Sequence, residues 1–160
     1  MANKLGEYKG IPIINGDIFD SGADIIVHQV NCQGVMGSGV AKQVRERFPR
    51  VYNKYVNVCR ESNPLGDILL VCADDTDNSK PIIANLFAQN KYGYDGRCYT
   101  DYNALQKCLD KLNVCAKGMT VAIPYMMSCY RGGGDWEIVS TMIFNTLKDC
   151  DVTFYRYNKG

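Results

Sequence analysis

Six short apolar runs are spaced along the chain, and each has the length and residue types of a β-strand. The run at residues 24–30 is almost continuously apolar, which is typical of a strand buried on both faces. The last run is rich in aromatic and β-branched residues, which favour strands. Strands are therefore predicted at residues 11–14, 24–30, 67–73, 82–87, 120–123 and 152–157.

Apolar positions between these runs recur every three or four residues, which is the spacing of an amphipathic helix. Val40, Ala41, Val44 and Phe48 follow it until Pro49 ends the pattern. Strands that alternate with helices favour a three-layer α/β/α sandwich. Because no repeat, low-complexity tract or linker interrupts the pattern, we expect a single domain over the whole chain. Similar stripes predict about four helices, near residues 40–48, 51–59, 102–116 and 136–147.

The composition is that of a globular protein, since the 160 residues are 46% hydrophobic and 22% charged. The chain has 18 lysines and arginines and 17 aspartates and glutamates, so its formal net charge is +1. This balance predicts no basic face for duplex nucleic acid and no polybasic membrane anchor. The first residues lack the apolar core of a secretory signal, and the apolar runs are too short for a membrane span. We expect a cytoplasmic monomer without a membrane partner.

Eight cysteines and a single histidine, His28, are the residues that a metal or redox site would use. No C-x-x-C pair occurs, so the usual spacing of a structural zinc site is missing, and we expect neither a metal nor a cofactor. Several cysteines lie inside apolar segments of a chain without a secretory signal. This context favours reduced, buried thiols in a cytosol-like compartment over disulfides.

Two glycine-rich segments directly follow predicted strands, and each of them runs into a predicted helix. One covers residues 31–41 and the other residues 124–135. In an open α/β sheet, ligands bind beyond the carboxyl ends of strands, where backbone N–H groups and a helix N-terminus meet phosphate oxygens. Neither the full dinucleotide fingerprint nor a Walker loop is present. The two segments predict a clamp for a diphosphate, unless their glycines serve only tight turns.

Three stretches in order carry a resemblance to a known family: Gly16-Asp17-Ile18, residues 23–31, and Met36-Gly37-Ser38-Gly39-Val40-Ala41. Together they resemble the opening of a macrodomain, in the branch that contains the ADP-ribose 1''-phosphate phosphatases and the terminal ADP-ribose protein glycohydrolases. Residues 124–136 and 152–157 fit the same family in order. The resemblance implies a mixed six-stranded sheet between helices, with a cleft for ADP-ribose.

By the same resemblance, Asp17 accepts a hydrogen bond from the adenine amine, and the backbone N–H of Ile18 meets a ring nitrogen. Asn31 reaches the proximal ribose, and Tyr157 stacks on adenine. The alternatives are that Asp17 only caps a turn and that Tyr157 is an ordinary exposed aromatic residue. The predicted ligand-binding residues are Asp17, Ile18, Asn31, Met36, Gly37, Ser38, Gly39, Val40, Ser128, Cys129, Tyr130, Arg131, Gly132, Gly133, Gly134 and Tyr157.

Two residues are candidates for catalysis. Asp135 is the only carboxylate of the second glycine-rich loop, where the resembling hydrolases use an acidic residue as acid/base near the anomeric carbon. It also precedes a helix, so the alternative is a plain N-cap. His28 matches a histidine of the phosphatase branch and would protonate a leaving group near neutral pH. The alternative is that His28 is a hydrogen-bonded residue of the core without a catalytic role.

Two departures from the family pattern bear on function. The lysine of the glycohydrolase branch has no counterpart that can be placed, although Lys91 lies in the segment concerned. Tyr130 stands where a glycine is expected, and Arg131 adds a charge that would bind phosphate or carboxylate unless both side chains point to solvent.

We expect a hydrolase that acts at C1'' of the distal ribose of an ADP-ribose derivative. The bond broken would join C1'' to a protein side chain, a base of nucleic acid or a phosphate. The alternative is a non-catalytic binder of ADP-ribose or of an NAD-derived signalling nucleotide.

Overall fold

The computed structural model describes residues 3–157, which form seven strands, four α-helices and one short 3-10 helix. In chain order these elements are β1 (Asn3–Tyr8), β2 (Ile11–Asn15), η1 (Ile18–Asp20), β3 (Ile25–Asn31), α1 (Gly39–Arg47), α2 (Pro49–Glu61), β4 (Ile68–Cys72), β5 (Ile82–Gln89), α3 (Tyr102–Cys115), β6 (Thr120–Pro124), α4 (Trp136–Thr146) and β7 (Asp151–Arg156).

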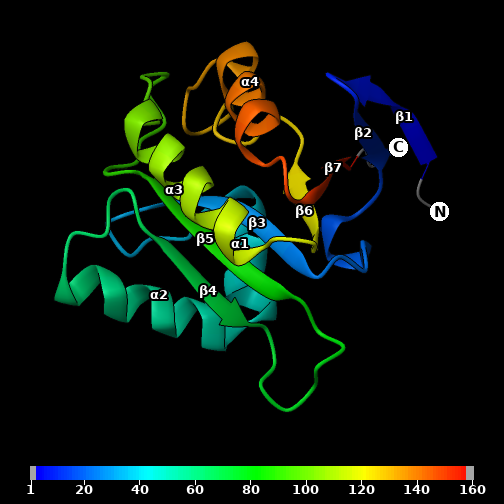
Figure 1. Cartoon of the computed structure of the whole chain (residues 1–160). Helices are drawn as coiled ribbons and strands as arrows, with labels where there is room; N and C mark the ends of the chain where they lie inside the picture. The colour runs from blue at the N-terminus through cyan, green and yellow to red at the C-terminus, as the bar shows by residue number, and fades with distance from the viewer. Residues whose placement is uncertain (1–2, 158–160) are drawn as a thin grey trace.

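The strands form one mixed sheet in the order β1-β2-β7-β6-β3-β5-β4 (Figure 1). The four inner pairs are parallel, and the outer pairs β1–β2 and β4–β5 are antiparallel. The carboxyl ends of five parallel strands therefore meet at one edge of the sheet. β3 pairs with β6 at only two positions, Ile25 with Val121 and Ile26 with Ala122, so this ladder ends before the carboxyl ends of both strands.

Helices cover both faces of the sheet, and each face has its own apolar core. Ile25 and Val27 of β3 belong to the core that includes residues of α3 and α4. Ile26 and Val30 of the same strand belong to the core that includes residues of α1 and α2. This division follows from the alternation of side chains along a strand. The three-layer α/β/α sandwich predicted from the sequence is confirmed.

The sheet has seven strands, so the prediction of six was one too few. The missing strand is β1, which holds one large aliphatic residue, Leu5, and a glycine, Gly6. β1 lies at the edge of the sheet, most of its residues are exposed, and its register with β2 shifts between Lys4 and Gly6. An edge strand held by backbone hydrogen bonds needs no apolar alternation, so its sequence gives little signal.

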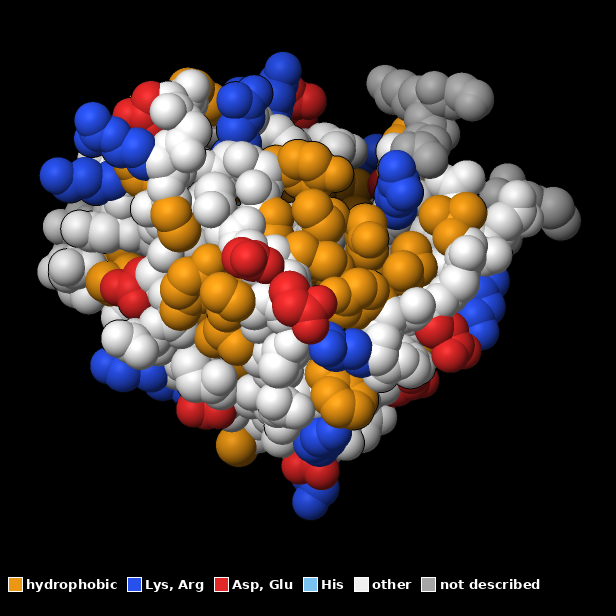
Figure 2. All heavy atoms as spheres, turned by 90° about the horizontal axis from the view of Figure 1, so that it is seen from above, with side chains coloured by type: hydrophobic (Ala, Val, Ile, Leu, Met, Phe, Trp, Pro, Cys, Tyr) orange, Lys and Arg blue, Asp and Glu red, His pale blue; other side chains and the backbone are white. Residues whose placement is uncertain are grey.

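Apolar side chains are also exposed on one outer face. Figure 2 views the molecule from above the orientation of Figure 1 and shows hydrophobic side chains gathered in the middle of that face, with charged side chains around them. On α4, which lies at the top of Figure 1, Ile138 and Phe144 are exposed. None of the helices within residues 3–157 combines the length and the apolar character that crossing a membrane requires.

Candidate functional site

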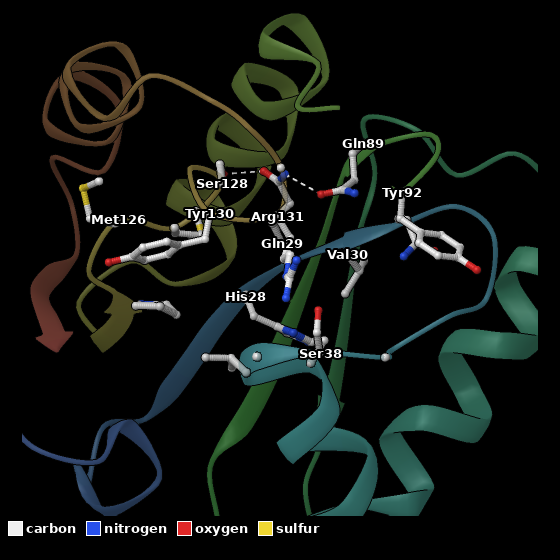
Figure 3. Close-up of a pocket in the computed structure, with 18 of the residues that line it drawn as sticks. His28, Gln29, Val30, Ser38, Gln89, Tyr92, Met126, Ser128, Tyr130 and Arg131 are labelled. Atoms are coloured by element: carbon white, nitrogen blue, oxygen red, sulfur yellow. Dashed lines mark hydrogen bonds between the residues drawn. The ribbon is translucent and has the colours of Figure 1, made fainter. Parts of the chain in front are cut away.

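A cavity of about 190 Å³ opens at the carboxyl ends of β3, β5 and β6, where the β3–β6 ladder has ended (Figure 3). The residues around it come from β3, the β3–α1 loop, the segment after β5 and the loop after β6. They are His28, Gln29, Val30, Asn31, Val35, Gly37, Ser38, Gly39, Val40, Ala41, Gln89, Tyr92, Gly93, Tyr94, Pro124, Tyr125, Met126, Met127, Ser128, Tyr130, Arg131 and Gly132.

Asn31 at the end of β3 organises the first glycine-rich loop. Its Oδ1 accepts hydrogen bonds from the backbone of Gln33 and Val35, at 3.0 and 3.4 Å, and its Nδ2 donates to the Val35 carbonyl at 2.8 Å. The buried Tyr55 hydroxyl lies 2.7 Å from the Asn31 carbonyl and 2.8 Å from Oδ1. Because the side-chain amide is held on both sides, this loop is preorganised at the cavity wall.

The N-terminus of α1 follows this loop and faces the cavity. Ser38 is its N-cap, and the Ser38 side chain makes no capping hydrogen bond, so it does not cover the first-turn N–H groups. Gly39 has φ +59°, a left-handed conformation that an L side chain rarely adopts. Ser38, Gly39, Val40 and Ala41 all line the cavity. A helix N-terminus with uncovered N–H groups is suited to bind an anion.

A network of side-chain amides and hydroxyls holds the loop after β6 against β3 and β5. Gln29 Nε2 donates to Gln89 Oε1 at 2.8 Å and to Thr100 Oγ1 at 2.9 Å, while the Ser128 hydroxyl donates to Gln29 Oε1 (Figure 3). The Thr100 hydroxyl in turn donates to the Ser128 carbonyl at 2.9 Å. These bonds join β3, the end of β5, the segment before α3 and the loop after β6.

The same loop carries backbone strain. Met126 and Ser128 have φ values of +65° and +74°, although neither is glycine. Each such conformation costs about 1–3 kcal/mol and persists only where the surroundings impose it. For Ser128 the imposing contacts are the hydrogen bonds to Gln29 and Thr100. Strained backbone of this kind is concentrated at binding and catalytic sites.

His28 lines the cavity as a neutral, hydrogen-bonded side chain. Its Nε2 lies 2.7 Å from Asn85 Oδ1, and Asn85 Nδ2 is committed to the Leu69 carbonyl at 2.9 Å. Asn85 therefore offers an acceptor, so the proton of the imidazole is on Nε2. Burial lowers the pKa of His28 to about 4, against the opposing effect of the Asn85 bond. Nδ1 is a buried acceptor without a partner among residues 3–157.

Among residues 3–157, one charged side chain lines the cavity, that of Arg131. Its guanidinium lies 4.4 Å from the centre of the Tyr94 ring, which comes from the segment after β5. The loops after β5 and β6 are thus joined across the cavity by a cation–π contact. Tyr130 beside it is 77% exposed, and Tyr130 and Tyr92 stand at opposite sides of the cavity in the view of Figure 3.

The comparison with protein families identifies the family to which this fold belongs. The model of the Macro domain family matches residues 27–143, which is more than half of the chain. The chain belongs to the macrodomain family. Its resemblance to this family, inferred from the glycine-rich motifs, is confirmed.

Relatives of this macrodomain include named hydrolases. The DNA ADP-ribosyl glycohydrolase of Mycobacterium tuberculosis is 28% identical over 152 residues, which cover 91% of this chain and 42% of the relative. The ADP-ribose 1''-phosphate phosphatase of Saccharomyces cerevisiae is 35% identical over 107 residues, covering 64% of this chain and 59% of the relative. The chain thus spans about two fifths to three fifths of the length of these two relatives.

Solved structures agree with the fold. The macrodomain of Mycobacterium tuberculosis DarG has a TM-score of 0.73 and 27% identity and covers 88% of this chain and 93% of that one. Thermosipho africanus DarTG, solved in complex with ADP-ribose, has a TM-score of 0.76 at 19% identity, covering 97% of this chain and 43% of that one. At that identity the second likeness concerns the fold alone.

About half of the site residues predicted for the macrodomain line the cavity. The structure brings together ten of them: His28, Asn31, Gly37, Ser38, Gly39, Val40, Ser128, Tyr130, Arg131 and Gly132. Eight others lie outside the lining: Asp17, Ile18, Met36, Cys129, Gly133, Gly134, Asp135 and Tyr157. The roles assigned to both groups stay predictions.

Both aspartates of the prediction have capping contacts, which were the alternatives to their functional roles. Asp17 Oδ1 accepts from the backbone N–H of Phe19 at 2.9 Å and so caps η1, and its Oδ2 lies 3.4 Å from Arg47. Asp135 Oδ1 accepts from the backbone N–H of Glu137 at 2.8 Å and so caps α4. In each carboxylate, one oxygen accepts the capping hydrogen bond and the other oxygen takes no part in it.

Several lining residues were not predicted from the sequence. Gln29 and Gln89 are polar residues in largely apolar strands, which was an available signal. The tyrosines after β5 follow a strand end, as the predicted glycine-rich segments do. Tyr125, Met126 and Met127 lie within the predicted segment 124–135 but were not named as site residues. Lys91 is not among the lining residues, and its carbonyl accepts a hydrogen bond from Gln89 at 2.9 Å.

Proposed function

We propose that this macrodomain binds ADP-ribose in the cavity and hydrolyses an ADP-ribose derivative at C1'' of the distal ribose. The observation that supports this most is the pair of walls around the cavity. One wall is the N-terminus of α1 with Gly39, and the other is the strained loop that ends at Gly132. A diphosphate between them would meet backbone N–H groups rather than carboxylates, because no Asp or Glu is among the lining residues.

We infer the position of each end of the ligand from the order of the strands. Asp17 and Ile18 follow β2, which lies beyond β7 and β6 on one side of β3. If adenine lies there, the distal ribose lies at the other end of the cavity, toward β5. Asn31, at the end of β3, is then within the half of the cavity that holds the ribose groups. This placement uses Asp17 Oδ2 for adenine and leaves Oδ1 in its cap.

The hydrolysis needs an activated water. The oxygen of water would bond to C1'', the bond from C1'' to the leaving group would break, and the proton released from water would pass to the leaving group. Asp135 is the carboxylate of the loop whose residue Gly132 lines the cavity, so it is the candidate to carry that proton. His28 is not suited to donate a proton near pH 7, because burial keeps the pKa of its imidazole low.

The alternative is a binding module without turnover. Two observations favour it: within the described chain no carboxylate lines the cavity, and the one histidine there is neutral. Such a protein would hold ADP-ribose or an NAD-derived nucleotide with the same contacts. ADP-ribosylated protein and nucleic acid would then be partners rather than substrates.

Calorimetric titration with ADP-ribose, with AMP as the reference ligand, tests the binding. We expect saturation by ADP-ribose, and about tenfold weaker binding for Asp17→Asn, the scale of a lost hydrogen bond to a charged group. Asparagine keeps the capping oxygen, and Asp20→Asn in the same short helix is the matched control. If Asp17→Asn binds ADP-ribose as tightly as the parent protein does, adenine does not bind at Asp17.

Turnover is tested by incubation with ADP-ribose 1''-phosphate, an ADP-ribosylated oligonucleotide and an ADP-ribosylated peptide, with released ADP-ribose as the readout. Cleavage of at least one of these substrates supports the hydrolase. Saturable binding of ADP-ribose without any release favours the binding module.

A further inference from the structure

Arg131 is an unpaired positive charge at the wall of the cavity. It is the one Lys, Arg, Asp or Glu among the lining residues, and no carboxylate of residues 3–157 forms an ion pair with it. Its recorded partner is the face of the Tyr94 ring, at 4.4 Å. Within residues 3–157 the guanidinium N–H groups of Arg131 have no hydrogen-bond partner. A planar guanidinium matches the oxygens of a phosphate in a two-pronged hydrogen bond.

Tyr94 links this charge to the segment that follows β5. Tyr94 belongs to the segment after β5, and a Cβ placed on Gly37 would lie 3.6 Å from the Tyr94 hydroxyl. The ring therefore stands between the β3–α1 loop and Arg131. In the sheet, β5 is on the opposite side of β3 from β7 and β2. The Arg131–Tyr94 contact thus ties this charge to the segment after β5, on the opposite side of β3 from β2 and Asp17.

We propose that Arg131 is a specificity-determining residue that binds a phosphate carried by the substrate beyond C1''. The inference rests on the proposed function, which places adenine at Asp17 and the distal ribose toward β5. The preferred derivative is then a phosphate-bearing one, either a monoester at C1'' or ADP-ribosylated nucleic acid, whose phosphodiesters lie next to the modified nucleotide. An ADP-ribosylated protein side chain with uncharged neighbours offers this guanidinium no anion.

The diphosphate of ADP-ribose itself is a competing partner for Arg131. That diphosphate has other donors, because the first-turn N–H groups of α1 are not covered by the Ser38 side chain. The two assignments differ in one measurable way. If Arg131 binds the diphosphate, replacing Arg131 weakens the binding of every ligand equally. If Arg131 binds a phosphate beyond C1'', replacing Arg131 weakens the binding of only those ligands that carry such a phosphate.

The test compares the parent protein with Arg131→Gln, Arg131→Lys and the control Arg60→Gln, which removes one charge from the exposed surface of α2. Arg131 is itself exposed, so these variants are expected to fold. The probes are ADP-ribose, ADP-ribose 1''-phosphate, an ADP-ribosylated single-stranded DNA oligonucleotide, and a peptide ADP-ribosylated on one glutamate between uncharged residues. The readout is kcat/KM for probes that are cleaved and Kd for probes that are only bound.

For Arg131→Gln we expect at least a tenfold loss with the 1''-phosphate, with the oligonucleotide or with both, and less than a threefold change with ADP-ribose and the peptide. Arg131→Lys should lose an intermediate amount, because lysine keeps the charge but not the planar fork. The phosphate probe that loses activity identifies the source of the phosphate. An equal loss with all four probes, no loss with either phosphate probe, or a parent that prefers the peptide overturns the proposal. A parent that does not bind ADP-ribose overturns the proposed function itself.

Discussion

Asp135 caps α4 and is also the proposed acid/base of the site. One oxygen caps α4 by accepting the Glu137 N–H, while the backbone N–H of Asp135 donates to the Tyr102 hydroxyl at 2.9 Å. The side chain is therefore fixed at the end of the loop that forms one wall of the cavity. Asparagine has the same size and keeps an acceptor for the cap, so Asp135→Asn separates the two uses.

We predict that Asp135→Asn binds ADP-ribose within about threefold of the parent and loses turnover by roughly 10²-fold or more, the usual size of a lost acid/base group. Asp101→Asn is the matched control, since Asp101 caps α3 in the same way, accepting from the Ala104 N–H at 3.0 Å. Steady-state kinetics on any cleaved substrate give the result. If Asp135→Asn retains full activity, Asp135 serves only as the N-cap of α4.

His28 makes a prediction about pH. Burial holds its folded-state pKa at about 4, below the usual value of 6.5, so between these pH values the unfolded chain binds a proton that the folded chain does not. The free energy of unfolding should therefore fall as pH decreases from about 6.5 to 4, by up to about 3 kcal/mol. Because His28 is the single histidine of the chain, urea unfolding and ¹⁵N NMR of the imidazole report on it alone near pH 6.

His28→Gln is the control for that measurement, because it removes the titrating group and should flatten the pH dependence between pH 6.5 and 5. The NMR spectrum should also show the proton on Nε2, as the Asn85 contact requires. An imidazole that titrates near 6.5 in the folded protein would contradict the burial, and a neutral imidazole with its proton on Nδ1 would contradict the tautomer.

At the scale of elements, the pattern of apolar residues determined which strands and helices could be predicted from the sequence. The buried strands and the four helices carry their signal because their side chains fill the two cores. β1 carries little signal, because an edge strand depends on backbone bonds to β2. Both glycine-rich segments were predicted, but their glycines differ in ways that only the packing reveals.

Gly39 and Gly133 test this difference. Both have positive φ, +59° and +66°, but a Cβ on Gly39 meets nothing within 4 Å, whereas one on Gly133 would lie 2.4 Å from the Arg97 carbonyl. We predict that Gly39→Ala lowers the free energy of unfolding by about 1 kcal/mol and Gly133→Ala by at least about 2 kcal/mol. Gly10→Ala, at φ +83° in open space, is the control for Gly39. Equal losses from Gly39→Ala and Gly133→Ala, measured by thermal unfolding, would show that this clash relaxes without cost.

At the scale of the whole molecule, the sequence predicted where the site lies better than how it is held. Glycine-rich segments after strands gave the two walls of the cavity. The hydrogen bonds that fix them join Gln29, Gln89, Thr100 and Ser128, which are up to 99 positions apart and share no local pattern. Such contacts depend on the strand order, which a single sequence does not state. The cytoplasmic location, the single domain and the monomer remain predictions.

The eight cysteines provide a test of the predicted redox state. None of them, all within residues 3–157, is in a disulfide. Burial raises the pKa of Cys32 and of Cys129 to about 11 and that of Cys108 to about 12, so their reactive thiolate fraction is small. The thiols of Cys72, Cys98 and Cys115 are in exposed residues.

We predict that a thiol reagent at neutral pH modifies three cysteines of the folded protein quickly and the other five slowly, and that all eight react after denaturation without a reductant. Mass spectrometry of partly modified protein identifies the fast three as Cys72, Cys98 and Cys115, because exposure and thiolate fraction together set the rate. Three or four disulfides in freshly prepared protein would contradict the prediction of reduced thiols. Fast modification of Cys108 would instead contradict its position on the buried face of α3, where its thiol lies 3.3 Å from the Asp67 carbonyl.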